Sequence, residues 1–188
     1  MTQTRDWQRN RDMWVRVLER QTGSRVDEWH RRIAAAGVDD EAALRDWLGR
    51  EGVKGYAQTL LVMERFGYPD FLLASADELI ERQYADRPQL RPIFEALVSA
   101  ANGLEDVVVQ TRKTYVSLVT PVRTFARIVP ATKHRVDLGL RLDGMKPRGR
   151  LVPSTIHETM TLQISLTAVE QVDEEVLDWL GKAHARNS

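Results

Sequence analysis

The sequence of 188 residues contains no cysteine. Disulfide bonds, thiolate nucleophiles, cysteine-ligated zinc and iron–sulfur clusters are therefore excluded. A chain of this length buries roughly 70% of its unfolded surface, so it needs neither a metal nor a disulfide in order to fold. The absence of cysteine also fits the reducing cytoplasm, where we expect this protein to act.

Long hydrophobic runs are also missing. The longest apolar segments have only a few residues, whereas a transmembrane helix needs about 20. The first residues, "MTQTRDWQRNRDMW", lack the apolar stretch of a signal peptide. We therefore expect a soluble cytoplasmic protein that has no membrane partner.

Neither sign of charge is in excess over the whole chain, which has 27 basic and 27 acidic side chains. The distribution is uneven, however, because residues 103–168 carry ten basic and five acidic side chains. With neutral histidines this segment has a net charge of +5, and the remaining residues carry the compensating negative charge. The basic segment favours an anionic partner.

Residues 1–68 predict a small helical domain of four short helices. Apolar residues recur there at helical spacing, and Gly or Asp residues separate the periodic segments. We expect Ser24 to cap the second helix, Gly37 to end it, and the fourth helix to span residues 55–66. Aromatic side chains are expected to form the core of this part: Trp7, Trp14, Trp29 and Trp47.

Residues 69–188 follow a different pattern. Two helical segments, "SADELIERQY" and "RPQLRPIFEALVSAAN", come first, and "VDEEVLDWLGKAHA" is a final amphipathic helix. Between them lie five segments that are rich in Val, Ile, Thr, Tyr and Phe and alternate with period two: "DVVVQT", "KTYVSLV", "RTFARIVP", "KHRVDLGLRL" and "ETMTLQISL". The sequence thus predicts an α+β fold, in which the helical unit is followed by a two-layer sandwich of about five antiparallel strands with flanking helices.

Two parts of the sequence resemble known families. "WVRVLERQTGSRVDEWHRRI" with "LRDWLG" is similar to a small helical bacterial family, domain of unknown function 4287. "RKTYVSLVTPVRTFARIVPATKHRVDLGLRL" with "VDEEVLDWLGKAH" resembles domain of unknown function 5655, which often follows the first family in one polypeptide. The resemblance implies a bacterial protein in two parts and transfers no activity.

The sheet part also resembles small sandwiches of the frataxin-like type. This is an analogy of fold alone and implies no iron chemistry. An iron site of that kind needs an acidic ridge, whereas the predicted sheet is basic.

Strand alternation places basic and aromatic side chains on one face of the predicted sheet. Val116 and Leu118 are expected to face the helices, so the other face is either open or a groove covered by the helical part. Gly139 on that face would let a ligand or another backbone approach closely. Clustered cations with aromatic residues suit an anionic or flat aromatic small ligand, or a single nucleic-acid strand. The candidate ligand-binding residues are Lys113, Tyr115, Arg123, Phe125, Arg127, Lys133, Arg135 and Arg141.

Several functions remain open at this level. The leading hypothesis is a non-enzymatic binding module, because no catalytic motif is complete and no catalytic residue can be assigned. The main alternative is a small-molecule enzyme that uses Tyr115 or His157 as acid or base. A nucleic-acid or protein-interaction module is a third alternative, and an ordinary solvated sheet face has the same pattern.

The four histidines do not have metal-ligand spacing. They are scattered without an i, i+4 pair and without an HExxH motif: His30, His134, His157 and His184. We therefore expect no metal and no other cofactor.

Overall fold

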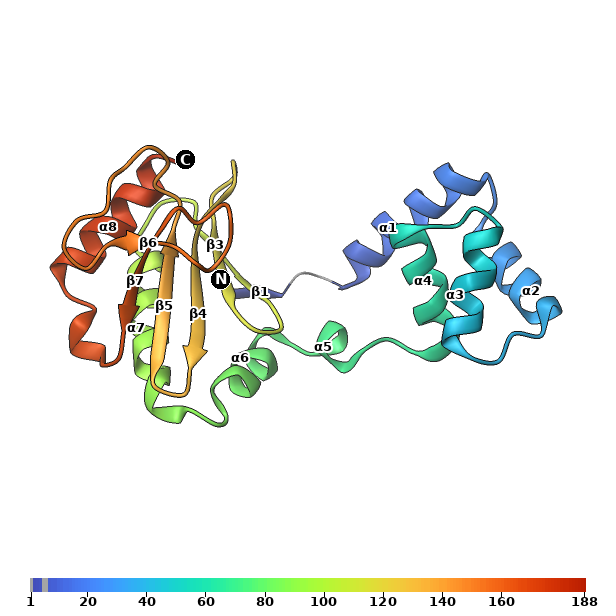
Figure 1. The fold of residues 1–188 in the computed structure, drawn as a ribbon, viewed down its shortest axis with the longest axis horizontal. Helices are drawn as coiled ribbons and strands as arrows, with labels where there is room; N and C mark the ends of the chain where they lie inside the picture. The colour runs from blue at the N-terminus through green and yellow to red at the C-terminus, as the bar shows by residue number, and fades with distance from the viewer. Residues whose placement is uncertain (1, 5–6) are drawn as a thin grey trace. The chain divides into compact units, whose positions relative to one another are not determined.

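The computed structural model describes residues 2–4 and 7–188, with side chains from residue 10 onward (Figure 1). The chain forms two compact units. One unit contains the strand β1 (Thr2–Thr4) and residues 75–188, and the other contains the helices up to Ala74. Each unit has its own hydrophobic core.

The helical unit contains four helices of ten residues or more. They are α1 (Trp7–Thr22), α2 (Val26–Ala36), α3 (Glu41–Arg50) and α4 (Gly55–Phe66), and the short α5 (Asp70–Leu73) follows. Asp40 caps α3 by accepting a 2.8 Å hydrogen bond from the backbone N–H of Ala43. Gly37 ends α2 in the left-handed conformation, with φ of 62°, as expected for a glycine at this position.

Tryptophan side chains contribute to this core as expected. Trp14 and Trp29 are buried, and Trp47 packs against the core and against Trp29, with ring centroids 6.2 Å apart. The side chain of Trp7 lies outside the described residues. The prediction that Ser24 caps α2 is wrong, because the N-cap position is Arg25. The hydroxyl of Thr22 instead organises this turn by accepting from the Ser24 N–H and the indole N–H of Trp29.

The other unit is an α+β sandwich, and the predicted fold class is confirmed. Its helices are α6 (Ala76–Tyr84), the 3-10 turn η1 (Pro88–Leu90), α7 (Arg91–Asn102), a second 3-10 turn η2 (Val169–Gln171) and α8 (Glu174–Ala185). Its strands are β1, β2 (Val108–Thr111), β3 (Val116–Val119), β4 (Thr124–Thr132), β5 (Arg135–Leu140), β6 (Val152–Pro153) and β7 (Leu162–Leu166).

The sheet has the strand order β1-β2-β3-β4-β5-β7-β6. β1 pairs with β2 in parallel, and the other neighbours are antiparallel. The sequence predicts five of these strands. It does not predict β1, which is short and polar, or β6, which has only two residues.

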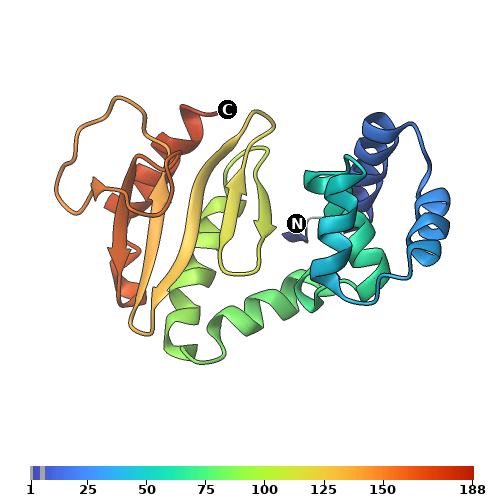
Figure 2. The ribbon, with the colours of Figure 1, turned by 45° about the vertical axis from the view of Figure 1, so that its right-hand side comes forward.

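One face of the sheet packs against helices. Val116, Ile128, Leu138 and Ile164 are register partners across β3, β4, β5 and β7, and all four are fully buried. They form one core with residues of α7 and α8, which lie behind the sheet in Figure 2. The alternation predicted for Val116 and Leu118 is therefore observed.

Within the part of the chain that the structure describes, every helix is too short or too polar to cross a bilayer.

Candidate anion-binding site on the sheet

The open face of the sheet is the face opposite α7 and α8, to which Ser117, Arg127, Gly139 and Gln163 belong. These four residues are register partners across β3, β4, β5 and β7 and alternate with the core residues described above. Gln110 of β2 extends the row, because it pairs with Ser117. The row is polar except at Gly139. Any ligand on this face would therefore meet amide, hydroxyl and guanidinium groups.

Phe125 does not belong to the open face, contrary to the prediction. Its side chain is fully buried, and its ring lies edge-on to the ring of His184 in α8, with centroids 5.3 Å apart. The cause is a register shift between β3 and β4: Leu118 pairs with Ala126, but Val119 pairs with Thr124. Phe125 is the extra residue of this bulge, so the alternation shifts at this point and turns the ring toward the helices.

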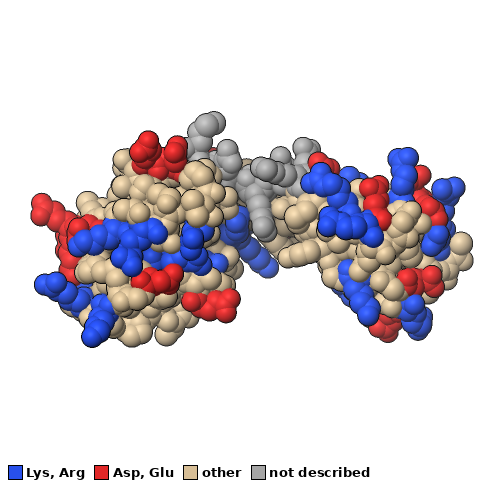
Figure 3. Space-filling model, turned by 90° about the horizontal axis from the view of Figure 1, so that it is seen from above, with Lys and Arg blue, Asp and Glu red and all other residues tan. Residues whose placement is uncertain are grey.

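The predicted cations lie at two different ends of the sheet. Lys113 lies in the β2–β3 turn and Lys133 in the β4–β5 turn, which are at the same end because β2 to β5 are antiparallel neighbours. Arg123 precedes β4 and Arg141 follows β5, at the opposite end. The eight residues therefore do not form one continuous basic patch. Figure 3 shows Lys and Arg next to Asp and Glu on the sheet unit.

Two of the predicted arginines have partners within the protein. Arg135 forms an ion pair with Asp137, with 2.9 Å between Nε and Oδ1, and the Asp137 carboxylate also accepts a 2.7 Å hydrogen bond from Ser165. Asp137 is buried at 3% exposure, so this carboxylate is held firmly in place. Arg141 donates from Nε to the backbone carbonyl of Thr159 at 3.2 Å. These two side chains stabilise the sheet and its connections.

Arg127 and Tyr115 are two predicted residues whose side chains the fold brings into contact. The guanidinium carbon of Arg127 lies 4.8 Å from the centroid of the Tyr115 ring, within the range of a cation–π interaction. Both side chains are half-buried. The Nε atom of Arg127 is buried and has no hydrogen-bond acceptor among the described residues. No described carboxylate lies within 4.0 Å of this guanidinium.

The open face is covered beside Arg127 by the chain itself. A Cβ atom at Gly139 would lie 2.8 Å from Cδ1 of Ile156 and 3.2 Å from Cβ and Cγ of Met160. The close approach expected at Gly139 is thus made by two side chains of the segment before β7. Next to them, Gln163 accepts a 2.8 Å hydrogen bond from the Thr155 N–H. In the rest of the row, Gln110 of β2 and Arg127 of β4 are half-buried, whereas Ser117 of β3 is buried.

Strand alternation places Ser117 on the face of Tyr115, but the predicted set of ligand-binding residues includes neither Ser117 nor Gln110. Ser117 is the register partner of Arg127 and is 3% exposed, and Gln110 accepts a 2.6 Å hydrogen bond from Arg112. The sequence signal for Ser117 is its alternation with Tyr115 and with the core positions on either side. A pattern made only of cations and aromatic residues does not include these two side chains.

His157, the residue of the enzymatic alternative, lies in the exposed segment before β7. Its Nδ1 atom is 2.9 Å from the hydroxyl of Thr159 and accepts from the Thr159 N–H at 3.1 Å. Both contacts involve a residue only two positions away, so they define a local turn.

A family comparison agrees with the fold. Residues 80–187 match the family described as Domain of unknown function (DUF5655), and the chain belongs to this family. The match covers α7, α8 and the strands β2 to β7. Searches of curated proteins and of solved structures found no match.

Proposed function

We propose that the sheet unit is a non-enzymatic binding module for a small anionic ligand, and that Arg127 is its main contact. The observation that supports this proposal is the half-buried guanidinium of Arg127, which stacks on Tyr115 and has no ion-pair partner among the described residues. The Nε–H of this guanidinium is buried without an acceptor, whereas its Nη groups are not buried in this way, so an anion would bind at the Nη side. The positive charge of Arg127 makes an anion the preferred acceptor.

The contact with Tyr115 supports a planar ligand. A guanidinium that stacks on an aromatic ring is held in one orientation, which favours bidentate binding of a carboxylate. The half-buried amide of Gln110 lies in the same row, and its NH2 group can provide a further hydrogen bond. We therefore propose a flat aromatic carboxylate as the ligand class. Lys113 and Lys133 lie at one end of the sheet, and Arg123 and Arg141 lie at the opposite end, outside this site.

Titration calorimetry on the whole chain tests the proposal with three probes: benzoate, inorganic phosphate and a short oligothymidine. We expect benzoate to bind best, and Arg127→Met to abolish its binding. Arg123→Met is the matched control, because it removes an exposed cation at the far end of β4 and should leave benzoate affinity unchanged. Equal losses in both variants, or no binding of any probe, would contradict the proposal. Preferred binding of oligothymidine, with a steep loss of affinity in salt, would favour a nucleic-acid function instead.

We also propose that the helical unit belongs to the bacterial family 4287. The support is the sequence resemblance around "QTGSRVDEWH" and the position of four short helices before the sheet unit. Detection of the same pair of segments in one chain across bacterial genomes would test this assignment.

A further inference from the structure

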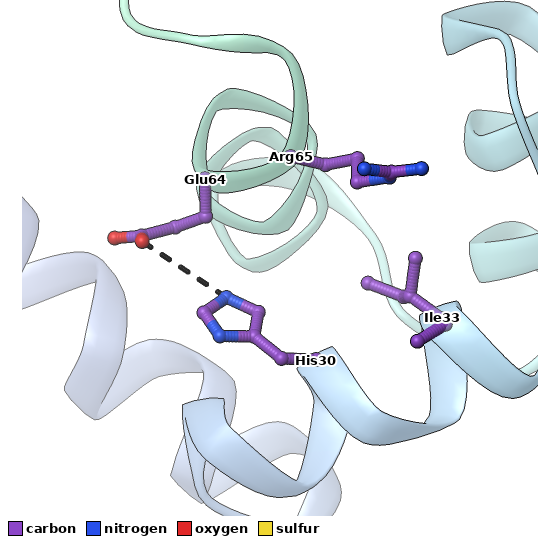
Figure 4. A pocket seen from close by; sticks show the side chains of 5 residues that line it. His30, Ile33, Glu64 and Arg65 are labelled. Atoms are coloured by element: carbon purple, nitrogen blue, oxygen red, sulfur yellow. Dashed lines mark ion pairs between the residues drawn. The ribbon is translucent and has the colours of Figure 1, made fainter.

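The helical unit contains a cavity of about 340 Å³ where α2 faces α4. Its described lining residues are His30, Ile33, Ala34, Glu64 and Arg65 (Figure 4). A second cavity of about 460 Å³ lies between α1 and the first turns of α2, and His30 also lines it. His30 therefore lines both of these cavities.

Glu64 is fixed in place by two hydrogen bonds to one of its oxygens. Oε1 accepts from Nε of Arg11 and from the hydroxyl of Tyr68, both at 2.7 Å. Burial favours the neutral carboxyl, but the hydrogen bonds from Tyr68 and Arg11 and the charges of Arg11 and His30 outweigh it. The pKa of Glu64 therefore lies below its ordinary value, and the group is an anion at neutral pH.

The other oxygen of Glu64 is directed toward His30, which also lines the cavity (Figure 4). Oε2 lies 3.9 Å from Nε2 of His30, which is too long for a hydrogen bond. Neither atom has a hydrogen-bond partner among the described residues. A carboxylate can accept about four hydrogen bonds, so Glu64 retains acceptor capacity on this side. A single nitrogen atom beside this gap, about 2.8 Å from both atoms, could donate to Oε2 and, when the His30 ring is neutral, to Nε2.

The other lining residues are two apolar side chains and the cation of Arg65, which points away from Glu64. Ile33 and Ala34 come from the face of α2 that borders the cavity. Arg65 extends to the opposite side of α4 from Glu64 in Figure 4, and its guanidinium lies 3.8 Å from Asp39. Its charge is therefore partly compensated and lies away from the gap between His30 and Glu64.

We propose that this cavity is a second ligand site that binds a small primary alkylamine in its ammonium form. The ammonium nitrogen lies beside the gap and donates to Oε2 of Glu64 and to Nε2 of the neutral His30 ring, and the alkyl chain packs on Ile33 and Ala34. The ammonium is preferred over a neutral alcohol because Glu64 carries a full negative charge. A carboxylate ligand is disfavoured because it would meet that same charge.

Proton–carbon NMR of the histidine rings in the whole chain tests this proposal. The probe is isopentylamine, and the two comparison probes are isopentanol and isovalerate. We expect isopentylamine to move the His30 signals in a saturable manner and the other two to move them little. No saturable shift with isopentylamine, or equal shifts with isovalerate, would overturn the proposal.

A matched pair of variants locates the site. Ala34→Leu fills the cavity, whereas Ala35→Leu places the same side chain on α2 at an exposed position outside the lining. Both changes keep a good helix former, so both variants should fold. We expect Ala34→Leu to weaken isopentylamine binding about tenfold or more, a change that corresponds to about 1.4 kcal/mol. We expect Ala35→Leu to leave this binding unchanged. Glu64→Gln should also abolish the shift, and wild-type binding by Ala34→Leu or by Glu64→Gln would contradict the assignment.

Discussion

The side chain of Ile156 occupies the position that a Cβ atom at Gly139 would need. Such an atom would lie 2.8 Å from Cδ1 of Ile156, which is shorter than a van der Waals contact. Gly139 lies in the middle of β5 and has an ordinary extended environment, so no positive φ explains the glycine. The close packing of the segment before β7 against the sheet explains it instead.

Gly139→Ala should therefore destabilise the sheet unit by about 1–3 kcal/mol, the usual cost of overpacking a filled site. Urea denaturation of the whole chain, followed by the amide NMR signals of β5, measures this change. The double variant with Ile156→Val, which removes the clashing Cδ1 atom, should recover part of the loss. An alanine variant as stable as the wild type would show that Ile156 and Met160 do not pack closely on β5.

Replacing tyrosine by phenylalanine should affect stability differently at Tyr84 and at Tyr68. Tyr84 is 3% exposed and packs against Phe94, and its hydroxyl has no partner among the described residues. Burial also raises its pKa. Tyr84→Phe should therefore leave stability unchanged or increase it, because it removes a desolvated hydroxyl that makes no compensating bond.

Tyr68→Phe is the control for this prediction. Its hydroxyl donates to Glu64 at 2.7 Å, so the substitution should cost about 1 kcal/mol or more in thermal or urea unfolding. A large loss for Tyr84→Phe, or no loss for Tyr68→Phe, would contradict the assigned hydrogen bonds.

Glu64 predicts a pH dependence of stability in the helical unit. Its pKa in the folded protein lies below the ordinary value of 4.5, so the unfolded chain binds the proton more tightly. The stabilisation is therefore fully present above about pH 4.5 and is lost as the pH falls through the folded pKa. The free energy of unfolding should be measured for the wild type and for Glu64→Gln from pH 7 to pH 3. We expect the difference between the two proteins to become smaller as the pH falls. A difference in unfolding free energy that does not change with pH would contradict the ionised, hydrogen-bonded state of Glu64.

The fold could be predicted largely from local patterns. The period-two alternation of "KTYVSLV" correctly places Val116 and Leu118 in the core, and the helical spacing around Trp14 and Trp29 correctly indicates the helical unit. These features depend on residues that are close in sequence. β1 was missed because its three polar residues form a strand only through their parallel pairing with β2.

The candidate site was less predictable, because it depends on contacts between distant residues. The position of Phe125 follows from a bulge in the pairing of β4 with β3, and the cover over Gly139 comes from residues 156 and 160. The ion pair between Arg135 and Asp137 could be expected from the sequence, because residues two positions apart in a strand lie on the same face. The stacking of Arg127 on Tyr115 required the register of two strands.

The Nε–H signal of Arg127 in proton–nitrogen NMR tests the central claim most directly, because it belongs to the guanidinium that is proposed to bind the anion. Its assignment follows from its disappearance in Arg127→Met. During titration with benzoate, we predict that this signal moves progressively, reaches a plateau, and reports the same affinity as calorimetry. A signal that stays in place while benzoate saturates the protein would contradict anion binding at Arg127.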